Sequence, residues 1–242
     1  MALNALHHVT CVCSDAQQTV EYYRDGLGFW LVKKTVNFDD PHSYHLYFGD
    51  ETGLPGTLLT FFEWPRADHG RLGRGTLESI GLFTPSVIEE CEAEDPDGLR
   101  LRLYPREEPG LRDVVAVGNP MLYAGLFDED APLEFGKPIE ETALIGAGTA
   151  HHTAWQVADD ADELTWFQRL VEIGLRPTPA ATQKYFHSFY FRMPDGNLLE
   201  LATGEPGFLV DESLESLGQE LSLPPWLEPE RATLERELAP IT

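Results

Sequence analysis

Two stretches of the sequence share one pattern: HHVTCVCSDAQQTVEYYRDGLGF at residues 7–29 and HHTAWQVADDADELTWFQRLVEIGL at residues 151–175. Each begins with a His pair in a run typical of a β-strand, and each reaches an Asp seven positions after its second His. Asp15 and Asp159 are suitable helix N-caps, because apolar residues then recur at helical spacing and a Gly follows. The two stretches therefore predict a repeated strand–helix unit.

The repeat continues into aromatic strands and a closing hairpin. HSYHLYF at 42–48 corresponds to HSFYF at 187–191, and each is followed by a Gly-containing turn and another strand-like run. Each unit then consists of a strand, a helix and about three more strands (βαβββ), over roughly 60 residues, a period at which repeated modules usually complete one another's sheet. PDGLRLRL at 96–103 is a third, partial copy of the hairpin.

The middle of the chain is too short for two more complete units. A strand at 76–83 leads almost directly into the partial hairpin, with no room for a helix between them. We therefore predict an α+β fold in which paired βαβββ modules form a curved, cup-like mixed sheet. Its parts are a first module, a shortened middle or linker, and a last module with a helical tail, at 1–66, 67–148 and 149–242. In the tail we expect helices at 211–217 and 228–238.

Composition excludes several classes of protein. The 242 residues include 17 basic and 41 acidic side chains, so the net charge is −24 and the surface repels phosphate backbones and anionic lipids. No apolar run approaches the ~20 residues of a membrane span. Cys11, Cys13 and Cys91 form no CxxC motif, and the first two read as packing residues. We expect a cytoplasmic protein that binds neither nucleic acid nor membrane.

The second His of each pair is the candidate metal ligand. If the two modules pair through pseudo-symmetry, His8 and His152 reach equivalent places on facing strands, and the closing hairpin presents Glu200 beside His152. Two neutral imidazoles and one carboxylate leave open positions on a metal, which suits a non-haem Fe(II) centre. Mn(II) or another divalent metal fits the same ligands.

The comparison between the copies limits the number of ligands. Thr60 in the first module and Arg102 in the partial hairpin stand where the last module has Glu200. The pattern therefore predicts two His and one Glu rather than four protein ligands. A structural zinc ion is the main alternative, although closed structural sites usually have four protein ligands. A single His taken alone is more often a hydrogen-bonded structural residue.

Other polar residues could serve the same site. Tyr190 is expected near Glu200 across the hairpin, where its phenol could donate a hydrogen bond. His187 and His45 are weaker candidates. Lys184 either attracts an anionic substrate or is simply solvated.

The sequence resembles the vicinal-oxygen-chelate superfamily, which includes glyoxalase I, bleomycin-resistance proteins and type I extradiol dioxygenases. More narrowly, it resembles ring-cleaving dioxygenases that act on hydroquinones. The matching stretches lie at 1–65 and 149–242 and include LHHVT at 6–10, LVKKTVNFDD at 31–40 and LELAT at 199–203. The resemblance implies an Fe(II) site made by His8, His152 and Glu200. It also implies a pocket with four polar residues, of which the last two are acid/base candidates: His7, Thr10, His151 and Tyr190.

The resemblance further implies a small aromatic diol and O2 as substrates, and it is compatible with a homo-oligomer. Two features depart from the family: the shortened middle, and Gln183–Lys184 where the family tends to have an Arg. We expect an extradiol-type dioxygenase of hydroquinone or catechol-like diols. The alternatives are a glyoxalase-type metal-dependent lyase or isomerase, in which Thr60 stands where a second carboxylate would be, and a non-catalytic small-molecule-binding protein.

Overall fold

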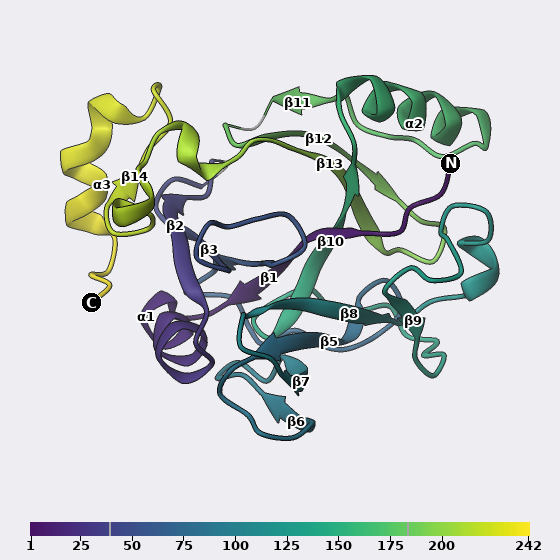
Figure 1. Cartoon of the computed structure of the whole chain (residues 1–242), viewed down its shortest axis with the longest axis horizontal. Helices are drawn as coiled ribbons and strands as arrows, with labels where there is room; N and C mark the ends of the chain where they lie inside the picture. Colours follow the sequence, from purple (N-terminus) through teal and green to yellow (C-terminus); the bar gives the residue numbers. More distant parts are fainter. Residues whose placement is uncertain (39, 183) are drawn as a thin grey trace.

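The first unit of the fold follows the expected order of strand, helix and three strands. The computed structural model describes residues 1–38, 40–182 and 184–242 (Figure 1). The unit comprises β1 (Leu6–Cys13), α1 (Ala16–Val20), β2 (Trp30–Val36), β3 (Tyr44–Gly49) and β4 (Leu58–Glu63). Asp15 caps α1 by accepting a hydrogen bond from the backbone N–H of Gln18. The winding then continues as a π-helix over Glu21–Gly26, which the apolar spacing did not indicate.

The last unit repeats this order. It comprises β10 (Thr149–Val157), α2 (Asp160–Glu172), β11 (Ala181–Thr182), β12 (Phe186–Arg192) and β13 (Leu198–Pro206). Asp159 caps α2 through the backbone N–H groups of Ala161 and Asp162. With β14 (Leu221–Ser222) from the tail, the strands of both units form one mixed sheet in the order β11-β12-β13-β10-β1-β4-β3-β2-β14. The predicted α+β fold of paired modules is confirmed.

The two units meet along β1 and β10, which pair antiparallel with Thr10 opposite His152. Within each unit the closing strand lies parallel to the first strand. Thr60 therefore pairs with Thr10, and Glu200 pairs with Ala154. Thr10 and Ala154 each lie two positions beyond the second His of their unit. This register places Glu200 and Thr60 at equivalent positions of the two halves, as the sequence repeat predicts.

The middle of the chain forms a second sheet in the order β6-β7-β5-β8-β9. Its strands are β5 (Leu77–Thr84), β6 (Cys91–Glu94), β7 (Arg100–Pro105), β8 (Gly110–Ala116) and β9 (Leu133–Phe135). The pairing follows the first sheet: β7 is parallel to β5, β8 is antiparallel to β5, and β9 is parallel to β8. A short turn replaces the helix between β5 and β6, so this sheet is an abbreviated copy of the first. It packs against β1 and β4 through β8 (Figure 1).

The tail differs in part from its predicted helices. The helix expected at 211–217 is wrong, because only the 3-10 turn Leu214–Ser216 forms there. Asp211 and Glu212 instead pair with the ammonium of Lys33, whose side chain is fully buried on β2, and these contacts hold the segment against the sheet. The second expected helix is present as the 3-10 turn Glu228–Glu230 followed by α3 (Arg231–Glu237), at the end of the sheet formed by β2 and β14 (Figure 1).

The apolar core lies between the sheets and under the helices. Tyr23, Phe61, Trp155 and Trp166 are among its largest fully buried side chains. Cys11 is also buried, and burial raises the pKa of its thiol, so it packs as expected. Over the described parts of the chain, no helix has the length and apolar character needed to cross a membrane.

Candidate metal centre

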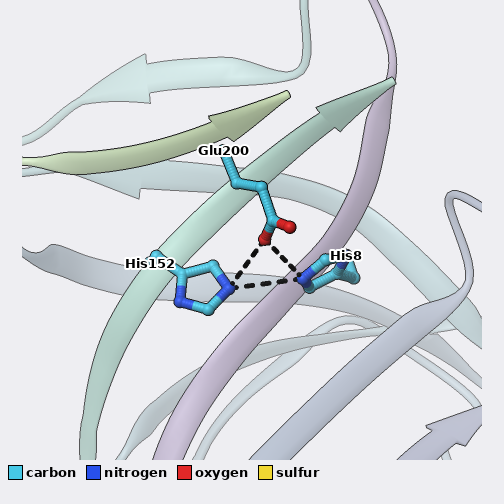
Figure 2. Close-up of side chains that lie close together, drawn as sticks. All are labelled: His8, His152 and Glu200. Carbon is cyan, nitrogen blue, oxygen red and sulfur yellow. Dashed lines mark hydrogen bonds and ion pairs between the residues drawn. The ribbon is translucent and has the colours of Figure 1, made fainter. Parts of the chain in front are cut away.

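Three side chains from adjacent strands converge on one point in the first sheet: His8 from β1, His152 from β10 and Glu200 from β13 (Figure 2). Oε2 of Glu200 lies 3.1 Å from Nε2 of His8 and 3.0 Å from Nε2 of His152, and the two Nε2 atoms lie 3.3 Å apart. Two ligand atoms at right angles around one cation, each about 2.1 Å from it, would be about 3.0 Å apart. The three atoms therefore have the separations of ligands that share a cation.

The electrostatics of the cluster also fit a cation. Glu200 is fully buried, and apart from the short contacts with the two imidazoles neither of its carboxylate oxygens has a hydrogen-bond partner among the described residues. Burial by itself would raise the pKa of Glu200, but His8 and His152 outweigh it and hold that pKa well below its usual range. Burial lowers the pKa of His152. A buried carboxylate facing two imidazoles is stable only with a positive charge nearby, which a divalent metal provides.

A neighbouring His holds the ring of His8 in place by a hydrogen bond. Nδ1 of His8 lies 2.9 Å from Nδ1 of His7, and Nε2 of His7 lies 3.0 Å from the carbonyl oxygen of Thr203. A carbonyl only accepts, so Nε2 of His7 carries the proton and donates to it. Burial lowers the pKa of His7 to about 3, so this ring is neutral and its Nδ1 accepts from Nδ1–H of His8. For Nε2 of His8 to bind a metal the ring must be neutral, and this contact then keeps its proton on Nδ1 and leaves Nε2 free to face the cluster.

In the second His pair the two Nδ1 atoms are again in contact, but His151 is less buried than its counterpart His7. Nδ1 of His152 lies 2.8 Å from Nδ1 of His151. For Nε2 of His152 to bind a metal, its Nδ1 must carry the proton and donate to His151, which leaves the proton of His151 on Nε2. Burial lowers the pKa of His151 to about 4, so the ring is neutral near pH 7. His151 borders the cavity described next, whereas His7 lies behind His8 and does not.

A cavity of about 470 Å³ opens onto the cluster. Its walls combine aromatic and polar side chains, contributed by residues on or beside seven strands of the first sheet: His8, Thr10, Asn37, Phe38, His45, Tyr47, Phe62, Trp64, His151, His152, Phe186, Tyr190 and Leu198. A larger cleft of about 1090 Å³ lies on the second sheet, but half of its lining residues are charged and it includes none of the three cluster residues. The smaller cavity is therefore the better candidate for an aromatic ligand.

Tyr190 and Thr10 border this cavity, as expected. Tyr190 stands opposite Glu200 in the β12–β13 pairing, which confirms the predicted register, and its ring centroid lies 5.2 Å from that of His152. Burial and the Glu200 carboxylate raise the pKa of Tyr190, so its phenol stays protonated and can donate. The hydroxyl of Thr10 lies 2.8 Å from that of Thr60.

Two cavity residues were underestimated or missed from the sequence. His45, a weak candidate, lines the cavity, and so does Tyr47, which the sequence analysis did not select. The repeat itself contained the signal for Tyr47, because it stands opposite Thr60 in the β3–β4 pairing just as Tyr190 stands opposite Glu200.

Two other candidates lie away from the cavity. Nδ1 of His187 pairs with Asp160 at the start of α2, 2.8 Å away, and His187 does not line the cavity. The ammonium of Lys184 pairs with Asp211 and lies 3.3 Å from the carbonyl oxygen of Leu223, so it contacts the tail and does not line the cavity. Its neighbour Gln183 lies outside the described residues.

Comparison with known proteins identifies relatives along the whole chain. The model of the Glyoxalase/Bleomycin resistance protein/Dioxygenase superfamily matches residues 5–201. MhqO of Bacillus subtilis (strain 168), provisionally named a ring-cleaving dioxygenase, is 32% identical over 97% of this chain and 96% of its own length. The chlorohydroquinone/hydroquinone 1,2-dioxygenase of Sphingobium indicum is 28% identical over 93% of both chains. The alignment with MhqO spans 298 positions, more than the 242 residues here, so that relative carries residues without a counterpart in this chain.

Solved structures agree with this assignment. A Bacillus subtilis protein whose crystal structure is described provisionally as a dioxygenase superposes with a TM-score of 0.91 at 29% identity, covering 100% of this chain and 98% of that one. Glyoxalase I from Zea mays superposes with a TM-score of 0.59 at 16% identity, covering 83% of this chain and 92% of that one. The likeness to glyoxalase I is one of fold alone.

Proposed function

The chain belongs to the Glyoxalase/Bleomycin resistance protein/Dioxygenase superfamily, and on this basis we propose that it is an Fe(II)-dependent, extradiol-type dioxygenase that cleaves the ring of hydroquinone or a catechol-like diol. The observation that carries the proposal is the cluster of His8, His152 and Glu200 at the wall of an aromatic-lined cavity. The relatives named as ring-cleaving and hydroquinone dioxygenases support the same class of reaction. The ligand and catalytic roles below are part of this proposal.

The ligand set suits a metal that must bind other molecules. His8, His152 and Glu200 would occupy three positions on one side of the ion and leave the remaining positions to face the cavity. Bound Fe(II) would supply the electron-transfer chemistry by which dioxygen reacts with an electron-rich ring. The protein contributes the orientation of the ring and the placement of protons.

Two hydrogen-bond donors lie beside the cluster. The phenol of Tyr190 is one, because burial and Glu200 keep it protonated. Nε2–H of His151 is the other, given the protonation that ligation of His152 imposes. A diol that loses a proton on binding has an anionic oxygen, and two donors that line the same cavity would stabilise that charge. In this proposal the same two groups would return protons as the ring opens.

Aromatic side chains shape the rest of the cavity. Phe62 packs against the ring of His151 with centroids 5.5 Å apart, and Phe186 packs against the ring of His8 at 5.4 Å. These contacts hold the imidazoles in place and exclude water from a flat aromatic substrate. A glyoxalase-type reaction is less well supported, because the position equivalent to Glu200 holds Thr60 and the cluster has one carboxylate.

The proposal is tested by oxygen uptake. The purified chain is loaded anaerobically with Fe(II), and oxygen consumption is followed with hydroquinone and with catechol, alongside loss of the aromatic absorbance. We expect one O2 consumed per ring opened in the wild type and none in Glu200→Ala. Bound iron without oxygen uptake on any aromatic diol would contradict the dioxygenase assignment and favour a binding protein of the same fold.

A further inference from the structure

Four side chains of the first unit, on β3, β4 and β1, form a continuous hydrogen-bonded chain, Tyr47–His45–Thr60–Thr10. The phenol oxygen of Tyr47 lies 3.0 Å from Nδ1 of His45, and Nε2 of His45 lies 3.1 Å from Oγ1 of Thr60. Oγ1 of Thr60 lies 2.8 Å from Oγ1 of Thr10. Three of the four line the cavity, whereas Thr60 is fully buried beneath them.

The chain runs across the wall of the cavity. It begins on β3 at His45 and Tyr47, crosses β4 at Thr60 and ends on β1 at Thr10, two residues from His8. Adjacent strands are about 4.8 Å apart, so β3 lies roughly 10 Å from β1 along the sheet. One end of the chain is therefore beside the metal ligands, and the other faces the far side of the cavity.

The two ends of the chain are coupled through the protons of a neutral imidazole. Burial, with a contribution from His8, holds the pKa of His45 well below its usual range, and burial raises the pKa of Tyr47, so both groups are uncharged. A neutral imidazole accepts at one nitrogen and donates at the other. When Tyr47 donates to Nδ1 of His45, Nε2–H donates to Thr60, and the Thr60 hydroxyl donates to Thr10. In this arrangement the Tyr47 oxygen still has a lone pair to accept with, and Thr10 still has a proton to donate.

The hydrogen-bonded chain is less favourable in folding free energy than an apolar wall would be. Burying four polar side chains is unfavourable compared with packing apolar groups of the same shape, even when every hydrogen bond is made. The equivalent half of the sheet has its polar groups at the cluster, where Glu200 and Tyr190 occupy the positions of Thr60 and Tyr47. The first unit has Thr60 in place of the carboxylate, so its polar wall is uncharged. Such a wall is suited to binding an uncharged hydroxyl.

We propose that the Tyr47–His45–Thr60–Thr10 chain recognises the second hydroxyl of a diol, at the end of the ring remote from the metal ligands. The inference rests on the proposed function, which places the first hydroxyl at the cluster. The remote hydroxyl donates to the Tyr47 oxygen, and this fixes the chain so that Thr10 donates toward the cluster. A para-diol carries its hydroxyls at opposite ends of the ring and engages both ends of the chain. Phenol and catechol lack the para hydroxyl, so hydroquinone is the preferred ligand.

Binding to a redox-inactive form of the protein tests this proposal. The protein is loaded with Zn(II), and the dissociation constants of hydroquinone, catechol and phenol are measured by titration calorimetry. We expect hydroquinone to bind about tenfold more tightly than phenol or catechol, the effect of one neutral hydrogen bond. In Tyr47→Phe this ratio falls to about twofold or less, while the affinity for phenol stays nearly unchanged.

Two further variants separate recognition from general damage. Thr60→Val breaks the chain beneath the cavity without altering its lining, and we expect it to reduce the hydroquinone preference in the same direction. Tyr44→Phe is the matched control, because Tyr44 is on β3 but donates to the carbonyl oxygen of Ala239, and it should keep the wild-type ratio. An unchanged ratio in Tyr47→Phe, or equal losses for hydroquinone and phenol in Tyr47→Phe and Thr60→Val, would overturn the proposal.

The outcome is independent of the dioxygenase assignment, since the Zn(II) form does not consume oxygen. If the protein binds hydroquinone with this preference but its Fe(II) form takes up no oxygen, the recognition proposal stands and the dioxygenase proposal fails. If the Fe(II) form consumes oxygen but the Zn(II) form shows no preference for hydroquinone over phenol, the recognition proposal fails and the dioxygenase proposal stands.

Discussion

The two sheets place their strands alike but carry different chemistry at equivalent positions. In the first sheet Thr10 pairs with His152 and Ala154 pairs with Glu200. In the second sheet the same pairings join Gly81 to Asp113 and Val115 to Glu134. Asp113 and Glu134 therefore stand where the candidate metal ligands His152 and Glu200 stand in the first sheet.

The second sheet supplies its own cation. Arg102 on β7 pairs with Gly81, as Thr60 on β4 pairs with Thr10. Its guanidinium contacts Asp113, and lies 3.1 Å from Glu134. Gly81 makes room for this arrangement, because a Cβ there would lie 2.2 Å from Oδ1 of Asp113. The second sheet thus balances its carboxylates with an internal guanidinium, whereas the described residues place no Arg or Lys at the equivalent cluster of the first sheet, where we propose a metal ion.

The largest difference between the sheets should appear when the equivalent glutamates are changed. Glu200→Gln removes the anionic ligand, and we expect oxygen uptake with Fe(II) and hydroquinone to fall at least about a thousandfold. Glu134→Gln is the matched control and should leave uptake within about twofold, since Glu134 contacts Arg102 rather than the cavity. Comparable losses in the two variants would show that the sheets are not functionally distinct in this way.

Within the first sheet, the equivalent tyrosines should separate catalysis from recognition. Tyr190→Phe removes a donor beside the cluster, and we expect kcat to fall about a hundredfold while the iron content is retained. Tyr47→Phe should act mainly on the apparent affinity for hydroquinone. The two variants are compared by steady-state oxygen uptake with iron content measured in parallel. Loss of iron from Tyr190→Phe would assign this residue to the assembly of the site instead.

Removal of the internal cation tests the second sheet. Arg102→Met leaves the buried Asp113 without this partner, and we expect the free energy of unfolding to fall by about 2 kcal/mol. Arg112 also contacts Asp113 but is more exposed, so Arg112→Met should cost about 0.5 kcal/mol or less. Urea unfolding measures both. Equal effects would contradict a specific role for Arg102.

The neutral wall of the cavity predicts a pH dependence of stability. His45 has its pKa held well below 6.5 in the folded chain, so below pH 6.5 the unfolded chain binds a proton that the folded chain does not. The free energy of unfolding should therefore fall as the pH drops, by about 1 kcal/mol between pH 7 and pH 5.5 from this group. His45→Gln should lose that contribution. A pH dependence identical to that of the wild type would place His45 in a solvated or charge-stabilised environment.

The sequence repeat predicted the sheet and the cluster because both follow from strand periodicity. Once the two His pairs and Glu200 are aligned, the pairing of equivalent strands brings them together. Other features depend on contacts that no local pattern encodes. The bulge of β1 between Leu6 and His8 accompanies the placement of His7 behind His8, and Lys184 is held by Asp211 of the distant tail. The chain from Tyr47 to Thr10 needs the register of three strands at once.

The central claim is that His8, His152 and Glu200 hold one divalent metal ion, and metal content after equilibrium dialysis tests it most directly. The wild type, Glu134→Gln, His8→Ala and Glu200→Ala are dialysed anaerobically against Fe(II), and bound iron is quantified per chain. The account predicts about one equivalent in the wild type and in Glu134→Gln, and less than about a tenth of that in His8→Ala and Glu200→Ala. Wild-type iron content in Glu200→Ala, or no bound iron in the folded wild type, would contradict it.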